Sequence, residues 1–60
     1  DYMSDREFWF NINKSGRLNA IELGTFLHFV NIDLEFSEVE KLVGIFGKTI
    51  SYKEFKKLIK

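Results

Sequence analysis

Cysteine and proline are absent from this chain of 60 residues, and histidine occurs once. Without cysteine there is no disulfide framework, and a single histidine cannot build a zinc site from Cys and His ligands. No apolar run approaches the roughly 20 residues that a membrane-spanning helix needs, and no signal-peptide pattern opens the chain. We therefore expect no transmembrane segment and a cytoplasmic location, and the absence of proline favours helices.

The chain also lacks an excess of one charge, because nine basic and nine acidic residues give a net charge of zero. The zero hides a gradient: residues 1–40 hold eight acids and three bases, whereas residues 41–60 hold six lysines and one glutamate. Such a split argues against a uniformly basic nucleic-acid binder. The sequence offers no glycine-rich phosphate loop, pair of catalytic carboxylates or nucleophile with a base, so we expect neither nucleic-acid binding nor enzymatic activity.

Three serines mark expected helix starts, because each has a glutamate three residues later, as in a capping box. They are Ser4, Ser37 and Ser51. Together with the apolar spacing that follows, the sequence predicts helices over residues 5–10, from about 20, over 38–46 and from 52 to about 59. Residues 32–36 break the apolar period and are expected to form a linker.

Residues 11–22 carry the most specific pattern in the chain. Oxygen-bearing side chains occur at the first, third, fifth, ninth and twelfth positions, with Gly16 at the sixth and Leu18 at the eighth. This is the spacing of a calcium-binding loop in which the seventh residue offers its backbone carbonyl. The candidate ligands are Asn11, Asn13, Ser15, Arg17, Asn19 and Glu22.

A shortened version of the same pattern ends at Glu54. Ile50 lies four residues before Glu54, as Leu18 lies four residues before Glu22, so both are expected in a two-residue antiparallel ribbon. Counting back from Glu54 puts valine, isoleucine and glycine at the first, third and fifth positions, and none of these supplies a side-chain ligand. The second loop is therefore not expected to bind a divalent ion.

On these residues, from Asn11 to Glu22 and from Ile50 to Phe55, the chain resembles an EF-hand pair, one lobe of the calmodulin, centrin and myosin light chain superfamily. It is most similar to the divergent, calcium-independent light chains of unconventional myosins. The resemblance implies an all-α fold of paired EF-hands, with four helices and a short two-stranded antiparallel ribbon between the loops. One lobe would span residues 1–60, with hand one at about 4–31 and hand two at about 37–60. The lobe would bind an amphipathic helix, such as the IQ motif of a myosin neck, in an apolar groove.

Calcium regulation is not expected, because Glu22 supplies the only formal negative charge in the first loop and sites of this kind tune affinity by ligand charge. Asn11 stands where the family usually has aspartate, and Arg17 brings a positive side chain nearby. We expect the loop to fold without metal, its polar side chains bonding to backbone amides, and hence no cofactor. The alternative is a weak calcium or magnesium sensor or buffer that uses this loop.

Apolar residues are numerous for so short a chain. We expect four phenylalanines to pack in the core near the ribbon: Phe10, Phe26, Phe46 and Phe55. The resemblance places the partner groove at Phe26, Leu27, Val30, Ile32, Leu34, Val39, Leu42, Val43, Phe46, Phe55, Leu58 and Ile59, and the last two should point inward from the fourth helix. An acidic rim of Glu35, Glu38 and Glu40 would steer the partner's basic residues. The second alternative is a structural lobe that packs against another lobe or self-associates.

Overall fold

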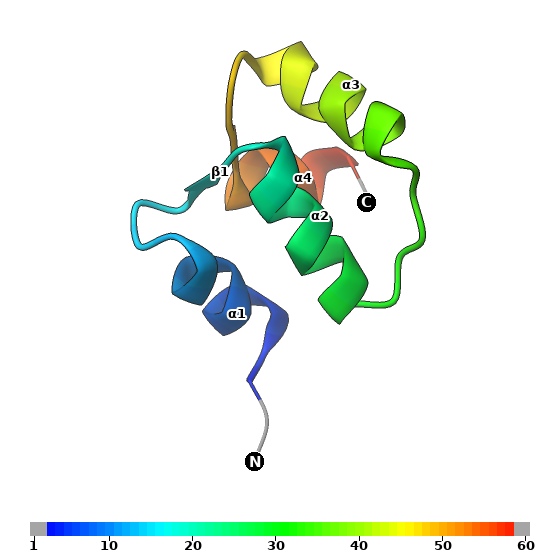
Figure 1. Cartoon of the computed structure of the whole chain (residues 1–60). Coiled ribbons are helices and arrows are strands. Elements are labelled where there is room, and N and C mark those ends of the chain that lie inside the picture. The colour runs from blue at the N-terminus through cyan, green and yellow to red at the C-terminus, as the bar shows by residue number, and fades with distance from the viewer. Residues whose placement is uncertain (1–2, 59–60) are drawn as a thin grey trace.

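The computed structural model describes residues 3–58, which form four helices and one two-stranded antiparallel ribbon (Figure 1). In chain order the elements are α1 (Asp5–Ile12), β1 (Arg17–Leu18), α2 (Ala20–Phe29), α3 (Phe36–Phe46), β2 (Ile50–Ser51) and α4 (Tyr52–Leu58). None of the helices in this part of the chain is both long and apolar enough to cross a membrane. The mostly helical fold and the ribbon are thus confirmed, whereas the pairing of two EF-hands stays a prediction.

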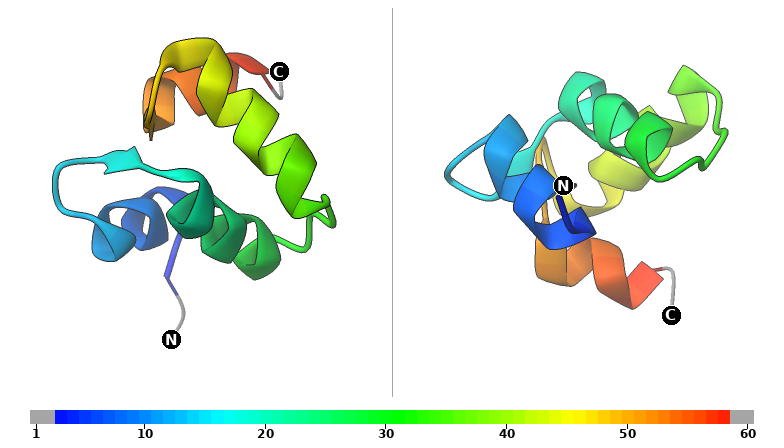
Figure 2. Two further views of the ribbon diagram at one scale, coloured as in Figure 1. Left: turned by 45° about the horizontal axis from the view of Figure 1, so that its top comes forward. Right: turned by 90° about the horizontal axis from the view of Figure 1, so that it is seen from below.

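The ribbon joins the two halves of the molecule. Leu18 pairs with Ile50 and Arg17 pairs with Ser51, in the register that the two glutamate spacings predict. In Figure 2 (left), α1 and α2 lie in the lower half and α3 and α4 in the upper half, with β1 at the edge where the halves meet. Both Leu18 and Ile50 are fully buried, so the ribbon closes one end of the core.

Two of the three expected capping boxes are confirmed. Ser4 accepts a hydrogen bond from the backbone N–H of Glu7 (3.2 Å), and the Glu7 carboxylate accepts one from the backbone N–H of Ser4 (3.0 Å). Ser51 and Glu54 exchange the same pair of bonds at 3.3 and 3.0 Å. Each box satisfies two of the free N–H groups at a helix start, which fixes where α1 and α4 begin.

The prediction of a third capping box, at Ser37, is wrong. Helix α3 begins at Phe36, and its N-cap is Glu35, whose side chain makes no capping bond. The backbone N–H of Val39 already donates to the Glu35 carbonyl at 3.0 Å, which places Ser37 inside the first turn. A box that the sequence reading missed starts α2, where the Asn19 side chain accepts from the Glu22 N–H at 2.8 Å.

Helix α2 ends in a Schellman motif. The N–H of Ile32 donates to the Leu27 carbonyl (2.9 Å), and the N–H of Asn31 donates to the His28 carbonyl (3.2 Å). Asn31 takes the left-handed conformation that this motif requires, with φ of 63°. The motif turns the chain sharply, so that Ile32 packs back against the core rather than extending the helix.

An aromatic cluster forms the centre of the core. The rings of Trp9, Phe26 and Phe55 lie with centroids 4.8 to 5.4 Å apart, and all three side chains are buried. Phe26 meets both Trp9 and Phe55 edge-to-face, and such contacts add to the stabilisation from burial. The remaining buried apolar residues surround the cluster: Leu18, Leu23, Leu27, Val39, Val43 and Ile50.

The expected core position of Phe10 is wrong. Phe10 is 39% exposed, whereas its neighbour Trp9 is fully buried. Consecutive helical residues point about 100° apart, so only one of the two can face the core. Of the other phenylalanines expected in the core, Phe26 and Phe55 are buried and Phe46 is half-buried.

Candidate functional site

The first loop is folded by its own polar side chains. Asn13 caps the end of α1, which is two residues longer than expected, and the Asn13 side-chain oxygen accepts from both the N–H (3.0 Å) and the hydroxyl (2.9 Å) of Ser15. The Ser15 hydroxyl oxygen then accepts from the N–H of Arg17 at 3.3 Å. These short-range bonds hold the chain in its turn.

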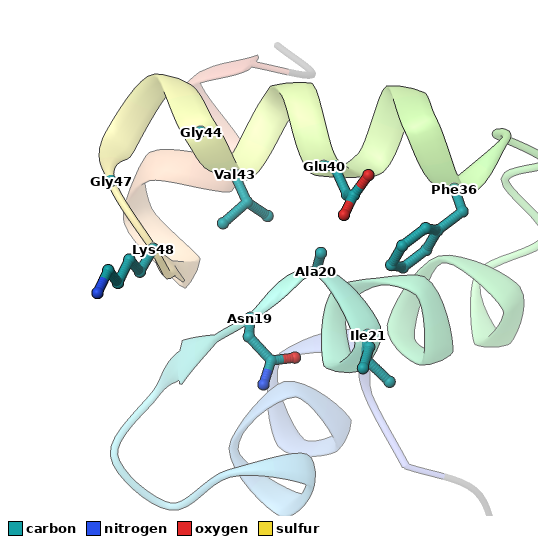
Figure 3. Close-up of a pocket in the computed structure, with 9 residues that line it drawn as sticks. All are labelled: Asn19, Ala20, Ile21, Phe36, Glu40, Val43, Gly44, Gly47 and Lys48. Atoms are coloured by element: carbon teal, nitrogen blue, oxygen red, sulfur yellow. The ribbon is translucent and has the colours of Figure 1, made fainter.

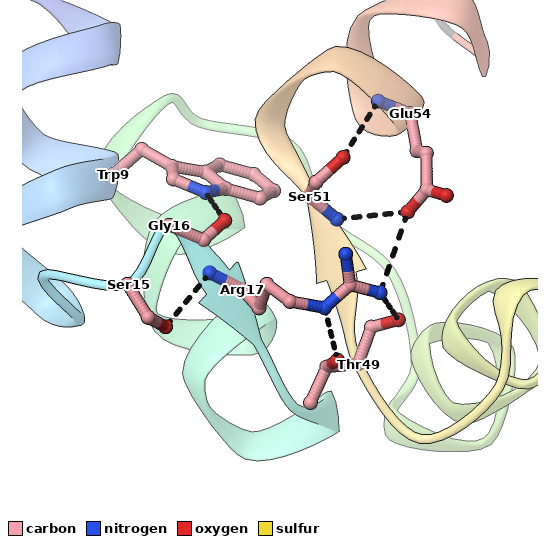
Figure 4. Close-up of polar contacts among 7 residues, drawn as sticks. All are labelled: Trp9, Ser15, Gly16, Arg17, Thr49, Ser51 and Glu54. Atoms are coloured by element: carbon pink, nitrogen blue, oxygen red, sulfur yellow. Dashed lines mark hydrogen bonds and ion pairs between the residues drawn. The ribbon is translucent and has the colours of Figure 1, made fainter.

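Gly16 lies at the sharpest point of this turn, with φ of 83°. A Cβ at Gly16 would lie 2.6 Å from Cε2 of Phe10, so the position is restricted both by backbone conformation and by space. The Gly16 carbonyl accepts a buried hydrogen bond of 2.7 Å from the indole N–H of Trp9 (Figure 4). The turn is therefore tied directly to the aromatic cluster.

Glu22, the only carboxylate of the loop, is already hydrogen-bonded on both oxygens. Oε1 accepts from the N–H of Asn19 (3.0 Å), and Oε2 accepts from the side-chain amide of Asn13 (3.4 Å). Asn11 does not join this network: it lies in α1, with its amide 3.6 Å from Sδ of Met3. Within residues 3–58, no three His, Cys, Asp or Glu side chains gather closely enough to hold a metal ion.

The side chain of Arg17 crosses from the first loop to the second (Figure 4). Its Nε donates to the hydroxyl of Thr49 (2.9 Å), one terminal nitrogen donates to the Thr49 carbonyl (3.4 Å), and the same nitrogen lies 3.9 Å from Glu54. The sequence indicated a backbone-carbonyl ligand and a nearby positive charge at Arg17, but not a contact with the second loop. Thr49 lies 32 residues further along the chain, so no local pattern reveals this bridge.

The structure buries much of the expected groove. Phe26, Leu27, Val39, Val43 and Phe55 are each at most 4% exposed, because the four helices pack their apolar faces on one another. The half-buried members of the expected set are Val30, Ile32, Leu42 and Phe46.

Other expected groove residues lie further out. Leu34 and Leu58 are 38% and 41% exposed, so the inward position expected for Leu58 is wrong, and Ile59 falls outside the described residues. Leu58 is the last residue of α4, three positions after the buried Phe55.

A pocket of about 210 Å³ between α1, α2 and α4 does bring four of the expected groove residues together. They are Phe26, Val30, Ile32 and Phe55, and the other residues at its wall are Asp5, Tyr52 and Lys56, which the sequence reading missed. The expected acidic rim does not border this pocket: Glu35 and Glu38 are exposed elsewhere, and Glu40 lines a different cavity. We call this pocket the three-helix pocket.

The cavity that Glu40 lines lies between α2 and α3 and measures about 390 Å³ (Figure 3). It is lined by Asn19, Ala20, Ile21, Phe36, Glu40, Val43, Gly44, Gly47 and Lys48, and we call it the α2–α3 cleft. In Figure 3, Phe36, Glu40 and Val43 point from α3 toward α2. Val43 is the only member of the expected groove set among these lining residues.

Comparison of the chain with protein-family models, with curated proteins and with solved structures gave no match.

Proposed function

We propose that the chain is a protein-binding module: a calmodulin-like lobe of two EF-hand-type halves that binds an amphipathic helix, of the kind found in myosin IQ motifs, without calcium regulation. The observation that carries the proposal is the three-helix pocket. Phe26, Val30, Ile32 and Phe55 give it an apolar wall that opens on the surface. An amphipathic helix presents apolar anchors to such a site at spacings of three, four and seven residues.

The size of the pocket suits one anchor of the partner helix. Ligand sites for whole small molecules usually measure about 300–1,000 Å³, and this pocket is smaller, at about 210 Å³. An aliphatic or aromatic side chain would enter it, while the rest of the helix would lie across the neighbouring surface. The branched and aromatic wall is less adaptable than a methionine-rich one, which favours a selective partner.

Charge at the pocket supports a partner with basic residues. Asp5 stands at the wall formed by α1, and Lys56 at the wall formed by α4. A basic residue of the partner would pair with Asp5, and the excess of acids in residues 1–40 would attract it over a longer range. An acidic residue of the partner would pair with Lys56 instead. Because Asp5 and Lys56 stand on different walls of the pocket, the two pairs would set the direction of the bound helix.

Deeper binding would require the helices to move apart, because Leu27, Val39 and Val43 are buried against their neighbours. A partner can open the lobe only by the difference in its affinity for the open and closed states. We therefore infer that the partner helix first engages the half-buried Val30 and Ile32, which line the pocket without any opening.

The bonds of Glu22 support the proposed independence from calcium. A bound ion would have to displace the N–H of Asn19 and the amide of Asn13 from the two carboxylate oxygens. Losing the bond to Asn19 would also remove half of the capping box that starts α2. One carboxylate gives a hard cation too little charge to offset these losses.

Isothermal titration calorimetry with a synthetic basic amphipathic peptide of the IQ type tests the proposal. We expect saturable binding with the same affinity in a chelator and in millimolar calcium. Val30→Asp and Ile32→Asp should each weaken binding at least roughly tenfold, equal to about 1.4 kcal/mol, because a charge would enter the apolar pocket. Ile45→Asp is the matched control, since Ile45 is 67% exposed and lines neither the pocket nor the cleft.

Two results would contradict the proposal. Unchanged affinity of the folded Val30→Asp and Ile32→Asp variants would remove the three-helix pocket from the binding site. Binding seen only in calcium, or a saturable calcium heat without peptide, would replace the calcium-independent module by the ion-binding alternative.

A further inference from the structure

The α2–α3 cleft carries an apolar surface that the three-helix pocket does not use, and the two share no lining residue. Two large side chains at its wall face solvent, Ile21 at 70% and Phe36 at 52% exposed. Exposed aliphatic and aromatic side chains gathered around a hollow are typical of an interaction surface. The cleft is therefore a second candidate interaction surface, separate from the three-helix pocket.

Gly44 keeps this cleft open. It lies within α3, and a Cβ added there would meet no atom within 4 Å. Glycine inside a helix costs roughly 0.5–1 kcal/mol relative to alanine, and no neighbouring atom in the fold requires it here. A helix position without a side chain lets the backbone of another helix approach closely.

The charges at the cleft lie on opposite sides of Gly44, with Glu40 inside α3 and Lys48 beyond its C-terminal end. Glu40 lies four residues before it, and Lys48 lies four residues after it. Figure 3 shows Glu40 on α3 and Lys48 just beyond the Gly47 end of the same helix. If two copies of α3 lay antiparallel and crossed at Gly44, Glu40 of each copy would lie toward the end of the other α3 that Lys48 follows.

We propose that the α2–α3 cleft is a self-association surface, on which a second copy of this chain packs with its α3 antiparallel about a two-fold axis near Gly44. Such an interface is isologous, so the Glu40–Lys48 pair forms twice. The exposed Ile21 and Phe36 border the cleft on which the second copy packs, and the zero net charge of the chain does not oppose association. This goes beyond the proposed function, because it uses a different surface and leaves the three-helix pocket free.

Sedimentation velocity from micromolar to millimolar concentration, with two charge reversals, tests the proposal. The wild-type chain should associate reversibly as concentration rises. Glu40→Lys and Lys48→Glu should each weaken association roughly tenfold or more, because each puts two like-charged pairs in the interface. An equimolar mixture of the two variants should associate again, since both pairs in the mixed dimer have opposite charges.

Matched controls separate this interface from a general effect of net charge. Glu38→Lys and Lys57→Glu make the same charge changes at exposed positions that do not line the cleft, and they should associate as the wild type does. Gly44→Leu fills the hollow and should abolish association without a change in far-UV circular dichroism. All five substitutions are at solvent-exposed positions, so the variants are expected to fold.

Three results would overturn the proposal. The first is a monomeric wild-type chain over the whole concentration range, and the second is a mixture of Glu40→Lys and Lys48→Glu that stays monomeric. The third is a monomeric chain whose Ile21 and Phe36 NMR signals shift when the amphipathic peptide is added, which would assign the cleft to a helix of another protein. Loss of peptide binding with intact self-association would contradict only the proposed function.

Discussion

The two loops that lead into the ribbon are built in opposite ways. Before β1, the chain is held by side-chain bonds among Asn13, Ser15 and Arg17, and its turn is fixed to the core through the indole of Trp9. Before β2, among the bonds found within residues 3–58, the side chain of Thr49 is held by Arg17 from the first loop. The first loop organises itself, whereas the second depends on the first.

Both loops nevertheless end in a capping box. Glu22 and Glu54 each close a box of two hydrogen bonds at the start of the following helix, with Asn19 and Ser51 as the caps. The paired strands and the boxes are thus common to both halves, and the loop interiors differ. The two strands thus pair although the loops before them differ in length and composition.

The largest expected effect comes from breaking the link between the first loop and the core. Trp9→Ala removes the centre of the aromatic cluster and leaves the Gly16 carbonyl without its buried donor, so we expect a loss of about 3–5 kcal/mol in the free energy of unfolding. Trp9→Phe keeps a ring but not the N–H, and should lose about 1–3 kcal/mol. Urea unfolding followed by circular dichroism measures both. A loss for Trp9→Ala no larger than that for Phe10→Ala would contradict the central place of Trp9.

An intermediate loss in the free energy of unfolding is expected when the glycines of the two loops are replaced. Gly16→Ala and Gly47→Ala both force an L-residue into positive φ, at a cost of about 1–3 kcal/mol, but only at Gly16 does the added Cβ meet a neighbour, Cε2 of Phe10. In double-mutant cycles, Phe10→Ala should recover at least about 0.5 kcal/mol of the Gly16→Ala loss. It should recover none of the Gly47→Ala loss. Equal recovery at both glycines would show that the contact with Phe10 is not the cause.

The smallest expected effect tests whether the second loop depends on the first. Arg17→Met removes the bonds to Thr49 and the contact with Glu54, and because the Arg17 side chain is 48% exposed we expect a loss of at most about 1 kcal/mol. The amide signals of residues 47–51 should nevertheless shift in a ¹H–¹⁵N NMR spectrum. Lys14→Met, an exposed position in the first loop, is the control and should leave those signals in place. Unshifted signals in Arg17→Met would show that the second loop holds itself.

Features set by neighbouring residues could be predicted from the sequence. The boxes at Ser4 and Ser51 depend on a spacing of three, and the pairing of Leu18 with Ile50 depends on a matched distance to two glutamates. The polar bonding within the first loop was also expected, because asparagine and serine side chains bond readily to backbone groups two residues away. The boxes and the loop bonds join residues a few positions apart, and the register of the ribbon follows from two such local spacings.

Features set by packing could not be predicted in the same way. Whether Trp9 or Phe10 faces the core depends on the rotation of α1, and both are aromatic residues at adjacent positions. The loop pattern places Asn19 at its ninth position, whereas in the structure the Asn19 side chain caps α2. The start of α3 at Phe36 places that ring beside the α2–α3 cleft, which exists only once α2 and α3 have packed.

The candidate site was predicted in part. Four of the expected groove residues do line one pocket, because apolar stripes on helices converge wherever the helices meet. The sequence could not show how deeply the helices bury this set, since burial of Leu27 and Val39 depends on the angles between helices. Nor could it show that Asp5 and Lys56 stand at the same pocket, 51 positions apart in the chain.

The unequal loops also imply an order in time. The bonds of the first loop join residues at most nine positions apart, so they can form as soon as the chain has been made through Glu22. The ribbon and the Arg17 bridge join residues 32 positions or more apart, and closing so long a segment is slow. During synthesis on a ribosome, the first loop is therefore expected to be in place before the second exists, and to serve as the template against which the second half is aligned.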